Sequence, residues 1–207
     1  SPTQHLKHPF LTQLWVKRDD LIDPYISGNK WRKLKFILRD AISKGKTHLV
    51  TFGGAFSNHL VATAAAASRN GLKSTGFVRG EQVNNELLVL CRLFGMDLIF
   101  IDSETYKQKK VCYALYFKQD ELAYFIDEGG ASAEAVIGCA EIIAELPEDT
   151  AHIFCAAGTG TTAAGLLKGL QKIGSKAMLH VVPVLKGGDF IEKEIQKYVP
   201  LSDHLRL

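Results

Sequence analysis

The hydrophobic positions of the chain follow two alternating patterns. Short apolar runs rich in β-branched residues are separated by longer stretches in which apolar residues recur every three or four positions. The first pattern is typical of buried strands and the second of amphipathic helices. We predict strands at residues 14–17, 48–52, 74–78, 97–101, 123–126, 152–155 and 179–184. We predict helices at residues 30–43, 57–70, 86–94, 105–118, 133–146, 160–173 and 189–197. This alternation favours an α/β fold with open, mostly parallel sheets built from βαβ units.

Composition and charge narrow the class of protein. The chain has 207 residues, 46% hydrophobic and 23% charged, which is ordinary for a globular protein with a buried core. Its net charge of +3 is small and dispersed, and no apolar run is long enough to cross a membrane. We therefore expect neither a nucleic acid nor a membrane as partner. The four cysteines lack CxxC spacing, so we expect reduced core residues in a cytoplasmic protein.

Three glycine-marked loops follow predicted strands. They are GGAFSNH at residues 53–59, EGGAS at residues 128–132 and AAGTGTTA at residues 156–163. Ligands of open α/β sheets bind beyond the carboxyl ends of the strands, which is where these loops lie. We therefore look for the functional site there.

The third loop has the features of a phosphate site. Gly158 and Gly160 allow the backbone to approach a ligand closely, and Thr159, Thr161 and Thr162 supply hydroxyl donors at a helix N-terminus. The loop matches neither the Walker sequence nor the dinucleotide fingerprint. A tight strand-to-helix turn with threonine capping remains the alternative interpretation.

The first loop resembles a second anion site. Ser57 can cap the following helix, and Asn58 and His59 offer backbone N–H groups in its first turn. A plain N-cap is the alternative. Two anion sites in one chain indicate a ligand with a phosphate and a partner with a carboxylate.

The stretch SGNKWRKLK contains the candidate nucleophile. Lys30 begins a helix, where a positive charge conflicts with the helix dipole, and a lysine in that setting binds its proton less tightly. Lys33 lies one turn further on and can reach a phosphate. We interpret Arg32 and Lys35 as solvated charges, and a solvated surface lysine is the alternative for both Lys30 and Lys33. A lysine combined with phosphate and carboxylate sites favours a pyridoxal-phosphate site.

Four motifs, in this order, carry a family resemblance: KRDDLIDPYISGNKWRKLK, TFGGAFSNHL, IDEGGAS and AAGTGTTAAG. Over nearly the whole chain, the sequence resembles the 1-aminocyclopropane-1-carboxylate (ACC) deaminase/D-cysteine desulfhydrase family. This family belongs to the fold type II, tryptophan-synthase-β-like pyridoxal-phosphate enzymes.

The resemblance implies a role for each matching residue. Lys30 would form the Schiff-base link to pyridoxal 5'-phosphate and would shuttle protons, while Asn58 would contact the ring hydroxyl of the cofactor. Ser57, with the N–H groups of Asn58 and His59, would bind the substrate carboxylate and would assist proton transfer. The phosphate would be held by Lys33 and by the third loop, Gly158, Thr159, Gly160, Thr161 and Thr162.

The resemblance also implies the domains and the reaction. Residues 1–30 and 128–207 would form the larger, pyridoxal-phosphate-binding domain, and residues 31–127 a smaller α/β domain, with the cofactor in the cleft. A small amino acid, ACC or D-cysteine, would be converted to ammonia and a 2-keto acid. Family analogy predicts a homodimer.

Two departures from the family pattern bear on activity. Phe56 occupies a position that is glutamine in the best-known members, which alters the pocket beside the ring. We also expect the large domain to be incomplete at its C-terminus, because the pocket tyrosines and the group opposite the pyridine nitrogen have no counterpart here. Three alternatives stay open. They are a β-elimination or β-replacement enzyme of the cysteine-synthase or dehydratase type, an inactive cofactor-binding protein, and a nucleotide-binding α/β module.

Overall fold

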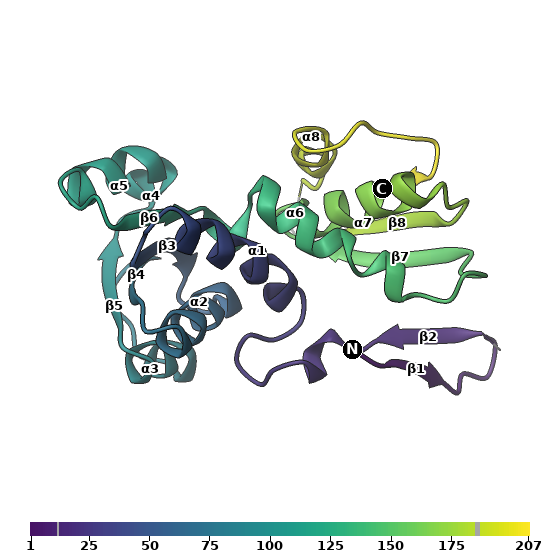
Figure 1. Ribbon diagram of the computed structural model, residues 1–207, viewed down its shortest axis with the longest axis horizontal. Helices are drawn as coiled ribbons and strands as arrows, with labels where there is room; N and C mark the ends of the chain where they lie inside the picture. The colour runs from purple at the N-terminus through teal and green to yellow at the C-terminus, as the bar shows by residue number, and fades with distance from the viewer. Residues whose placement is uncertain (12, 185–186) are drawn as a thin grey trace. The chain divides into compact units, whose positions relative to one another are not determined.

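The computed structural model describes residues 1–11, 13–184 and 187–207 (Figure 1). The chain divides into two compact units, one formed by Ser1–Lys33 with Val136–Leu207 and the other by Leu34–Ala135. Both limits fall inside helices, α1 (Asn29–Ser43) and α6 (Ala133–Ala140). The predicted boundaries, after residues 30 and 127, lie three and eight residues earlier, because no loop in the sequence marks a division that falls within a helix.

The unit Leu34–Ala135 is built on a four-stranded parallel sheet in the order β5-β4-β3-β6. Its strands are β3 (His48–Gly54), β4 (Lys73–Arg79), β5 (Met96–Ile101) and β6 (Ala123–Ile126). Its helices are α2 (Asn58–Arg69), α3 (Glu86–Leu93), α4 (Ser103–Lys107) and α5 (Lys109–Phe117), with the short 3-10 helix η2 at Glu128–Gly130.

Both faces of this sheet are covered because its strands are apolar on both sides. Phe52 and Phe77 pair across β3 and β4 with ring centroids 4.7 Å apart and pack with Tyr106 of α4. On the opposite face, Val78 packs with Leu60 of α2 and with residues of α3. Continuous apolar strands of this kind are typical of parallel sheets buried on both faces.

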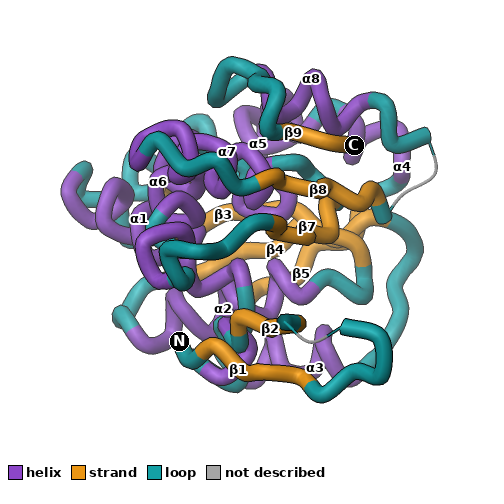
Figure 2. Tube along the Cα trace, turned by 90° about the vertical axis from the view of Figure 1, so that its right-hand side faces the viewer, coloured by secondary structure: helices purple, strands orange, loops and turns teal. Residues whose placement is uncertain are grey.

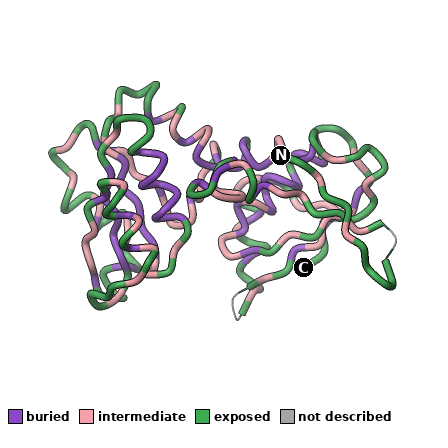
Figure 3. Tube along the Cα trace, turned by 90° about the horizontal axis from the view of Figure 1, so that it is seen from below, coloured by how far each residue is buried: buried purple, intermediate pink, exposed green. Residues whose placement is uncertain are grey.

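The unit of Ser1–Lys33 and Val136–Leu207 contains a three-stranded parallel sheet in the order β7-β8-β9 (Figure 2). Its strands are β7 (His152–Ala157), β8 (Met178–Pro183) and β9 (Leu205–Arg206). Its other elements are the antiparallel hairpin of β1 (Thr3–Leu6) and β2 (Leu14–Lys17), the helices α7 (Thr161–Ile173) and α8 (Phe190–Gln196), and the 3-10 helices η1 (Asp19–Leu21) and η3 (Ile143–Glu145). Buried positions gather inside each unit, while the loops are exposed (Figure 3).

Two glycines bring α7 against α6 and η3. A Cβ atom on Gly165 would lie 2.8 Å from the Val136 carbonyl oxygen and closer still to Cys139 Cβ. A Cβ atom on Gly169 would lie 2.6 Å from Ile143 Cγ1. No larger side chain fits at either position without displacement of backbone.

The predicted elements are present, with four differences. The strand at 14–17 pairs antiparallel with an unpredicted strand, Thr3–Leu6, and so lies outside the parallel sheets. The helix predicted at 105–118 is two helices separated at Gln108, and the first begins at the Asp102 cap. The helix predicted at 133–146 ends at Ala140 and is followed by η3. The strand Leu205–Arg206 was not predicted, because two residues are too few to show a hydrophobic pattern.

The cysteines are free thiols, with Cys91, Cys112 and Cys139 buried and Cys155 partly exposed. Searched over residues 1–11, 13–184 and 187–207, the chain has no cluster of potential metal ligands. Over the same residues, every helix is too short or too polar to span a bilayer.

Candidate active site

Lys30 is the second residue of α1, which begins after a sharp turn. Gly28 has φ +61°, and the N–H groups of Lys30 and Trp31 bond to the carbonyl oxygens of Ser27 and Gly28. Lys30 is partly exposed, and the burial of the rest of the residue lowers the pKa of its ammonium group, against a smaller opposing effect of the Cys139 thiol. A lowered pKa increases the fraction of neutral amine, the form that attacks a carbonyl carbon.

Lys33 lies one turn further along α1 and is 1% exposed. Burial, together with the smaller effect of the Lys30 charge, lowers the pKa of Lys33 to about 7, while the Cys139 and Cys155 thiols oppose the shift. A dianionic phosphate close to Lys30 and Lys33 would raise the pKa of both ammonium groups again. The arrangement is therefore suited to an anion.

The loop between β7 and α7 presents the N-terminus of α7. Its N-cap is Gly160, whose φ of +71° favours glycine and whose added Cβ would lie 3.1 Å from Glu194 Cβ. The first hydrogen bond within α7 runs from Ala164 N to Gly160 O, so the preceding N–H groups point out of the helix end. Because glycine is the cap, the threonine-capping alternative does not describe this turn.

Hydrogen bonds link the threonines of this loop to one another and to α1. Thr159 Oγ1 lies 3.3 Å from Thr161 Oγ1, and Thr161 is fully buried. Asn29 Nδ2 donates to Thr162 Oγ1 at 2.8 Å, which joins the first residue of α1 to the start of α7. Gly158 is partly exposed, and the nearest atom to a Cβ added there is Val184 Cγ2 at 3.9 Å.

Cys139 of α6 is a shared neighbour of these groups. It is fully buried, and burial raises the pKa of its thiol, while Lys33, a hydrogen bond with Thr162 and Lys30 act in the opposite direction. One unit therefore brings together both predicted lysines and the predicted phosphate loop. Sequence reasoning missed Asn29 and Cys139, although Asn29 stands directly before Lys30.

The second predicted site lies in the unit Leu34–Ala135. An added Cβ on Gly53 would lie 2.8 Å from Ser57 Oγ, so the glycine is what permits this close turn. Ser57 occupies the N-cap position of α2 in an extended conformation, but its side chain makes no capping hydrogen bond within the described residues. The plain N-cap interpretation therefore leaves the Ser57 hydroxyl unexplained.

The two residues after Ser57 differ in their exposure. Asn58 is exposed, whereas His59 is 2% exposed and directs Nε2 to Thr51 Oγ1 at 2.8 Å. The His59 side chain is thus part of the core, and its backbone N–H remains as the group offered at the helix end. Phe56 is 79% exposed.

The EGGAS loop lies beside this turn, in the same unit. β6 pairs with β3, and the Thr51 hydroxyl donates to the Ile126 carbonyl oxygen at 2.9 Å. Gly129 and Gly130 have φ values of +68° and +71°, and the loop contacts both β3 and α2. Two glycine loops therefore meet at the carboxyl ends of neighbouring strands.

Arg32 corrects a prediction. It is 5% exposed and not solvated: Nε and Nη2 bond to the Asp19 carboxylate at 3.0 and 2.8 Å. Nη2 and Nη1 also bond to the Glu145 carboxylate, the first at 2.9 Å. Arg32 therefore links α1 to η1 and η3 through ion pairs. Lys35 is partly exposed, as expected.

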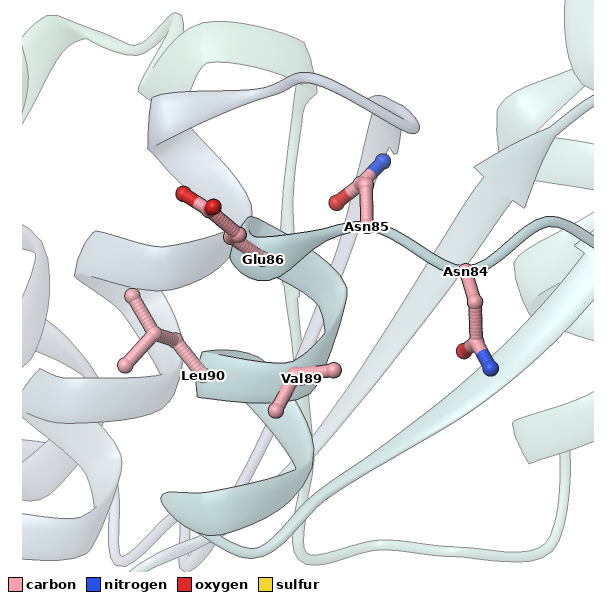
Figure 4. A pocket seen from close by; sticks show the side chains of 5 residues that line it. All are labelled: Asn84, Asn85, Glu86, Val89 and Leu90. Atoms are coloured by element: carbon pink, nitrogen blue, oxygen red, sulfur yellow. The ribbon is translucent and has the colours of Figure 1, made fainter.

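A pocket of about 540 Å³ lies elsewhere, at the start of α3, lined by Asn84, Asn85, Glu86, Val89 and Leu90 (Figure 4). It contains none of the predicted site residues. Asn85 caps α3 through Leu88 N at 3.0 Å and donates to the Ala55 carbonyl oxygen at 2.9 Å. The residue therefore supports the loop that carries Ser57.

The lysines and the glycine–threonine loop fit pyridoxal phosphate: one amine can hold an aldehyde, and a second amine with a helix N-terminus can hold a phosphate. A family profile described as "Pyridoxal-phosphate dependent enzyme" matches residues 1–204. The chain belongs to this family, whose cofactor is pyridoxal phosphate.

Individual relatives refine this assignment. A Thermotoga maritima protein named provisionally as an ACC deaminase is 37% identical over 83% of this chain and 59% of its own length. The mitochondrial bifunctional D-cysteine desulfhydrase/ACC deaminase of Arabidopsis thaliana is 30% identical over 89% of this chain and 52% of its own. A crystal structure described as an ACC deaminase homologue aligns with a TM-score of 0.78 and 28% identity, covering 93% of this chain and 65% of the other. The chain spans about three fifths of such relatives.

Proposed function

We propose that this protein is a pyridoxal-phosphate-dependent deaminase or lyase that acts on a small amino acid, either ACC or D-cysteine. The observation that carries the proposal is the pair Lys30 and Lys33 of α1, which share Cys139 as a neighbour, in a helix whose first residue bonds to Thr162 of α7. The names of the relatives support the substrate class. The products would be ammonia and a 2-keto acid, with hydrogen sulfide in addition from D-cysteine.

When bound, the cofactor supplies an electron sink for negative charge developing at the substrate Cα. Lys30 would hold the cofactor aldehyde through Nζ and, once displaced by the substrate amine, would carry a proton at Cα. Its lowered pKa suits both tasks, because the neutral amine is nucleophile and base.

Lys33 and the loop Gly158, Thr159, Gly160, Thr161 and Thr162 would hold the phosphate. The N–H groups at the start of α7 add hydrogen bonds and the positive end of the helix dipole. We accordingly assign the unit of Ser1–Lys33 and Val136–Leu207 as the cofactor-binding domain.

In the unit Leu34–Ala135, Ser57 Oγ and the N–H groups of Asn58 and His59 would bind the substrate carboxylate. Ser57 is suited to a second task, proton transfer, since capping does not occupy its hydroxyl. The exposed Asn58 side chain would contact the ring hydroxyl of the cofactor.

The test is an absorbance spectrum of the purified protein with pyridoxal phosphate, followed by separate additions of ACC, D-cysteine and L-serine with keto-acid detection. We expect a visible band, 2-oxobutanoate from ACC or pyruvate from D-cysteine, and loss of the band in Lys30→Ala. A Lys30→Ala protein that keeps the band would refute the lysine assignment. A band without keto acid would indicate an inactive cofactor-binding protein, and keto acid from L-serine alone would indicate a dehydratase-type enzyme.

The assembly proposal rests on family analogy alone, and the location proposal on the cysteine pattern of the sequence. We propose a homodimer, to be checked by light scattering of the purified protein, and a cytoplasmic location, to be checked by cell fractionation.

A further inference from the structure

We propose that Asn29 is a positioning residue that makes the Thr162 hydroxyl a hydrogen-bond donor toward an anion at the N-terminus of α7. The inference rests on the proposed function only for the identity of that anion as the phosphate of the cofactor. Asn29 has no assigned role in the site beyond its place next to Lys30.

The contact joins two helix starts that are distant in sequence. Asn29 is the first residue of α1 and Thr162 the second residue of α7, and Asn29 Nδ2 lies 2.8 Å from Thr162 Oγ1 in a partly buried position. The same bond fixes the backbone next to Lys30 relative to the phosphate loop.

The direction of this bond determines what Thr162 can do. An amide NH₂ group only donates, so Thr162 Oγ1 accepts the hydrogen bond from Asn29 with one of its lone pairs. The single hydroxyl proton must then point away from Asn29, toward another acceptor. Cys139, which shares a hydrogen bond with this hydroxyl, is one candidate acceptor.

A thiol is a weak acceptor and a phosphate oxygen is a strong one. An anion held by Lys33 and the first N–H groups of α7 would therefore take the Thr162 proton in place of Cys139. Asn29 prepares this donor before the ligand arrives, because it blocks the alternative in which Thr162 donates to α1.

The experiment compares two aldehydes that differ only in the phosphate, pyridoxal 5'-phosphate and pyridoxal. Each is titrated by absorbance into the wild-type apoprotein and into the variants Asn29→Asp, Asn29→Ala, Thr162→Val, Thr162→Ser and Asn29→Asp/Thr162→Val. The carboxylate of Asn29→Asp only accepts, so it draws the Thr162 proton back toward α1. Melting of each apoprotein reports folding.

We expect Asn29→Asp to weaken pyridoxal-phosphate binding by roughly tenfold or more and to leave pyridoxal binding close to wild type. Thr162→Val should show the same pattern, and Thr162→Ser, which keeps the hydroxyl, should restore the affinity. The double variant should bind no more weakly than Thr162→Val alone, because both changes act on one hydroxyl.

Three results would overturn the proposal. Equal losses for both aldehydes would mean a general structural role. An Asn29→Asp effect that persists undiminished in the Thr162→Val background would mean that charge alone acts. Asn29→Ala, a neutral variant that removes the donor, should weaken pyridoxal phosphate selectively, and an unchanged affinity would also contradict the proposal. A wild-type protein that binds neither aldehyde would instead refute the proposed function.

Discussion

Thr51 Oγ1 and His59 Nε2 are 2.8 Å apart, and this hydrogen bond places a proton on Nε2 of the imidazole. The Thr51 hydroxyl has one proton, which it donates to the Ile126 carbonyl oxygen at 2.9 Å. Nε2 of His59 must therefore carry a proton and donate it to Thr51. One buried hydroxyl thus connects β3, β6 and the start of α2, where the candidate carboxylate site begins.

Thr51→Val should destabilise the protein by about 2 kcal/mol, because it leaves a buried carbonyl and a buried N–H without partners while preserving shape. Thr51→Ser should recover most of this loss. The matched control is Thr63→Val, since the Thr63 hydroxyl is buried in α2 without a hydrogen-bond partner among the described residues. Urea denaturation should show Thr63→Val to be neutral or stabilising, and a loss equal to that of Thr51→Val would contradict the assignment.

The apoprotein should become more stable as pH rises from about 7 toward 10. The pKa of Lys33 is about 7 in the folded protein and near 10.5 when unfolded, so the unfolded chain binds more protons in this window. Lys33 alone contributes a slope of up to about 1.4 kcal/mol per pH unit. Urea midpoints measured across this range under reducing conditions should show a smaller slope in Lys33→Met.

Lys35→Met, which removes a lysine from the same helix, is the control for the Lys33 variant and should keep the wild-type slope. Saturating inorganic phosphate should flatten the wild-type slope, because a bound anion restores the charged form of Lys33. Identical slopes in all three proteins would show that Lys33 is not the group responsible.

Arg32→Met should destabilise the protein by about 3 kcal/mol or more. The substitution leaves the Asp19 carboxylate, 8% exposed, without its main countercharge. Arg32→Lys should recover little, because a single ammonium cannot match the forked contacts to Asp19 and Glu145. Thermal unfolding followed by circular dichroism provides the measurement, and a near-neutral Arg32→Met would mean that the ion pairs contribute nothing net.

Gly160→Ala should weaken pyridoxal-phosphate binding as well as stability. Gly174→Ala is a matched control at the other end of α7, with φ of +64° and no atom within 4 Å of the added Cβ. Both changes place an alanine in a left-handed backbone conformation, which should lower the free energy of unfolding by about 1 kcal/mol. Only Gly160→Ala reshapes the phosphate loop, so equal cofactor affinity in the two variants would exclude a binding role for this turn.

Much of the parallel fold could be predicted because its strands are apolar on both faces. β3 reads HLVTFGG, and this run is buried from Leu49 to Gly53. The polar strand Thr3–Leu6 carried no such signal, since hairpin pairing with Leu14–Lys17 and not apolar character defines it. The break at Gln108 also escaped prediction, because the apolar spacing continues across it.

The candidate site also has features that could be predicted from the sequence and features that could not. Lys30, Lys33 and the threonine loop could be predicted because glycine turns and helix starts are local features. The burial of Arg32 could not, since its partner Glu145 is 113 residues away and nothing in a helical pattern reveals it. The contact of Asn29 with Thr162 was hidden for the same reason, at a separation of 133 residues.

The close approach of α7 to α6 through Gly165 and Gly169 has a consequence for protein engineering. Where backbones touch without intervening side chains, neither helix can open or shift without unpacking the other, so α6 and α7 should exchange their amide protons as one cooperative segment. The loop at residues 156–160, which leads into α7, is therefore restrained by both helices. A library that varies the surface of α7 can be broad, but one that varies positions 165 or 169 would return mostly unfolded protein.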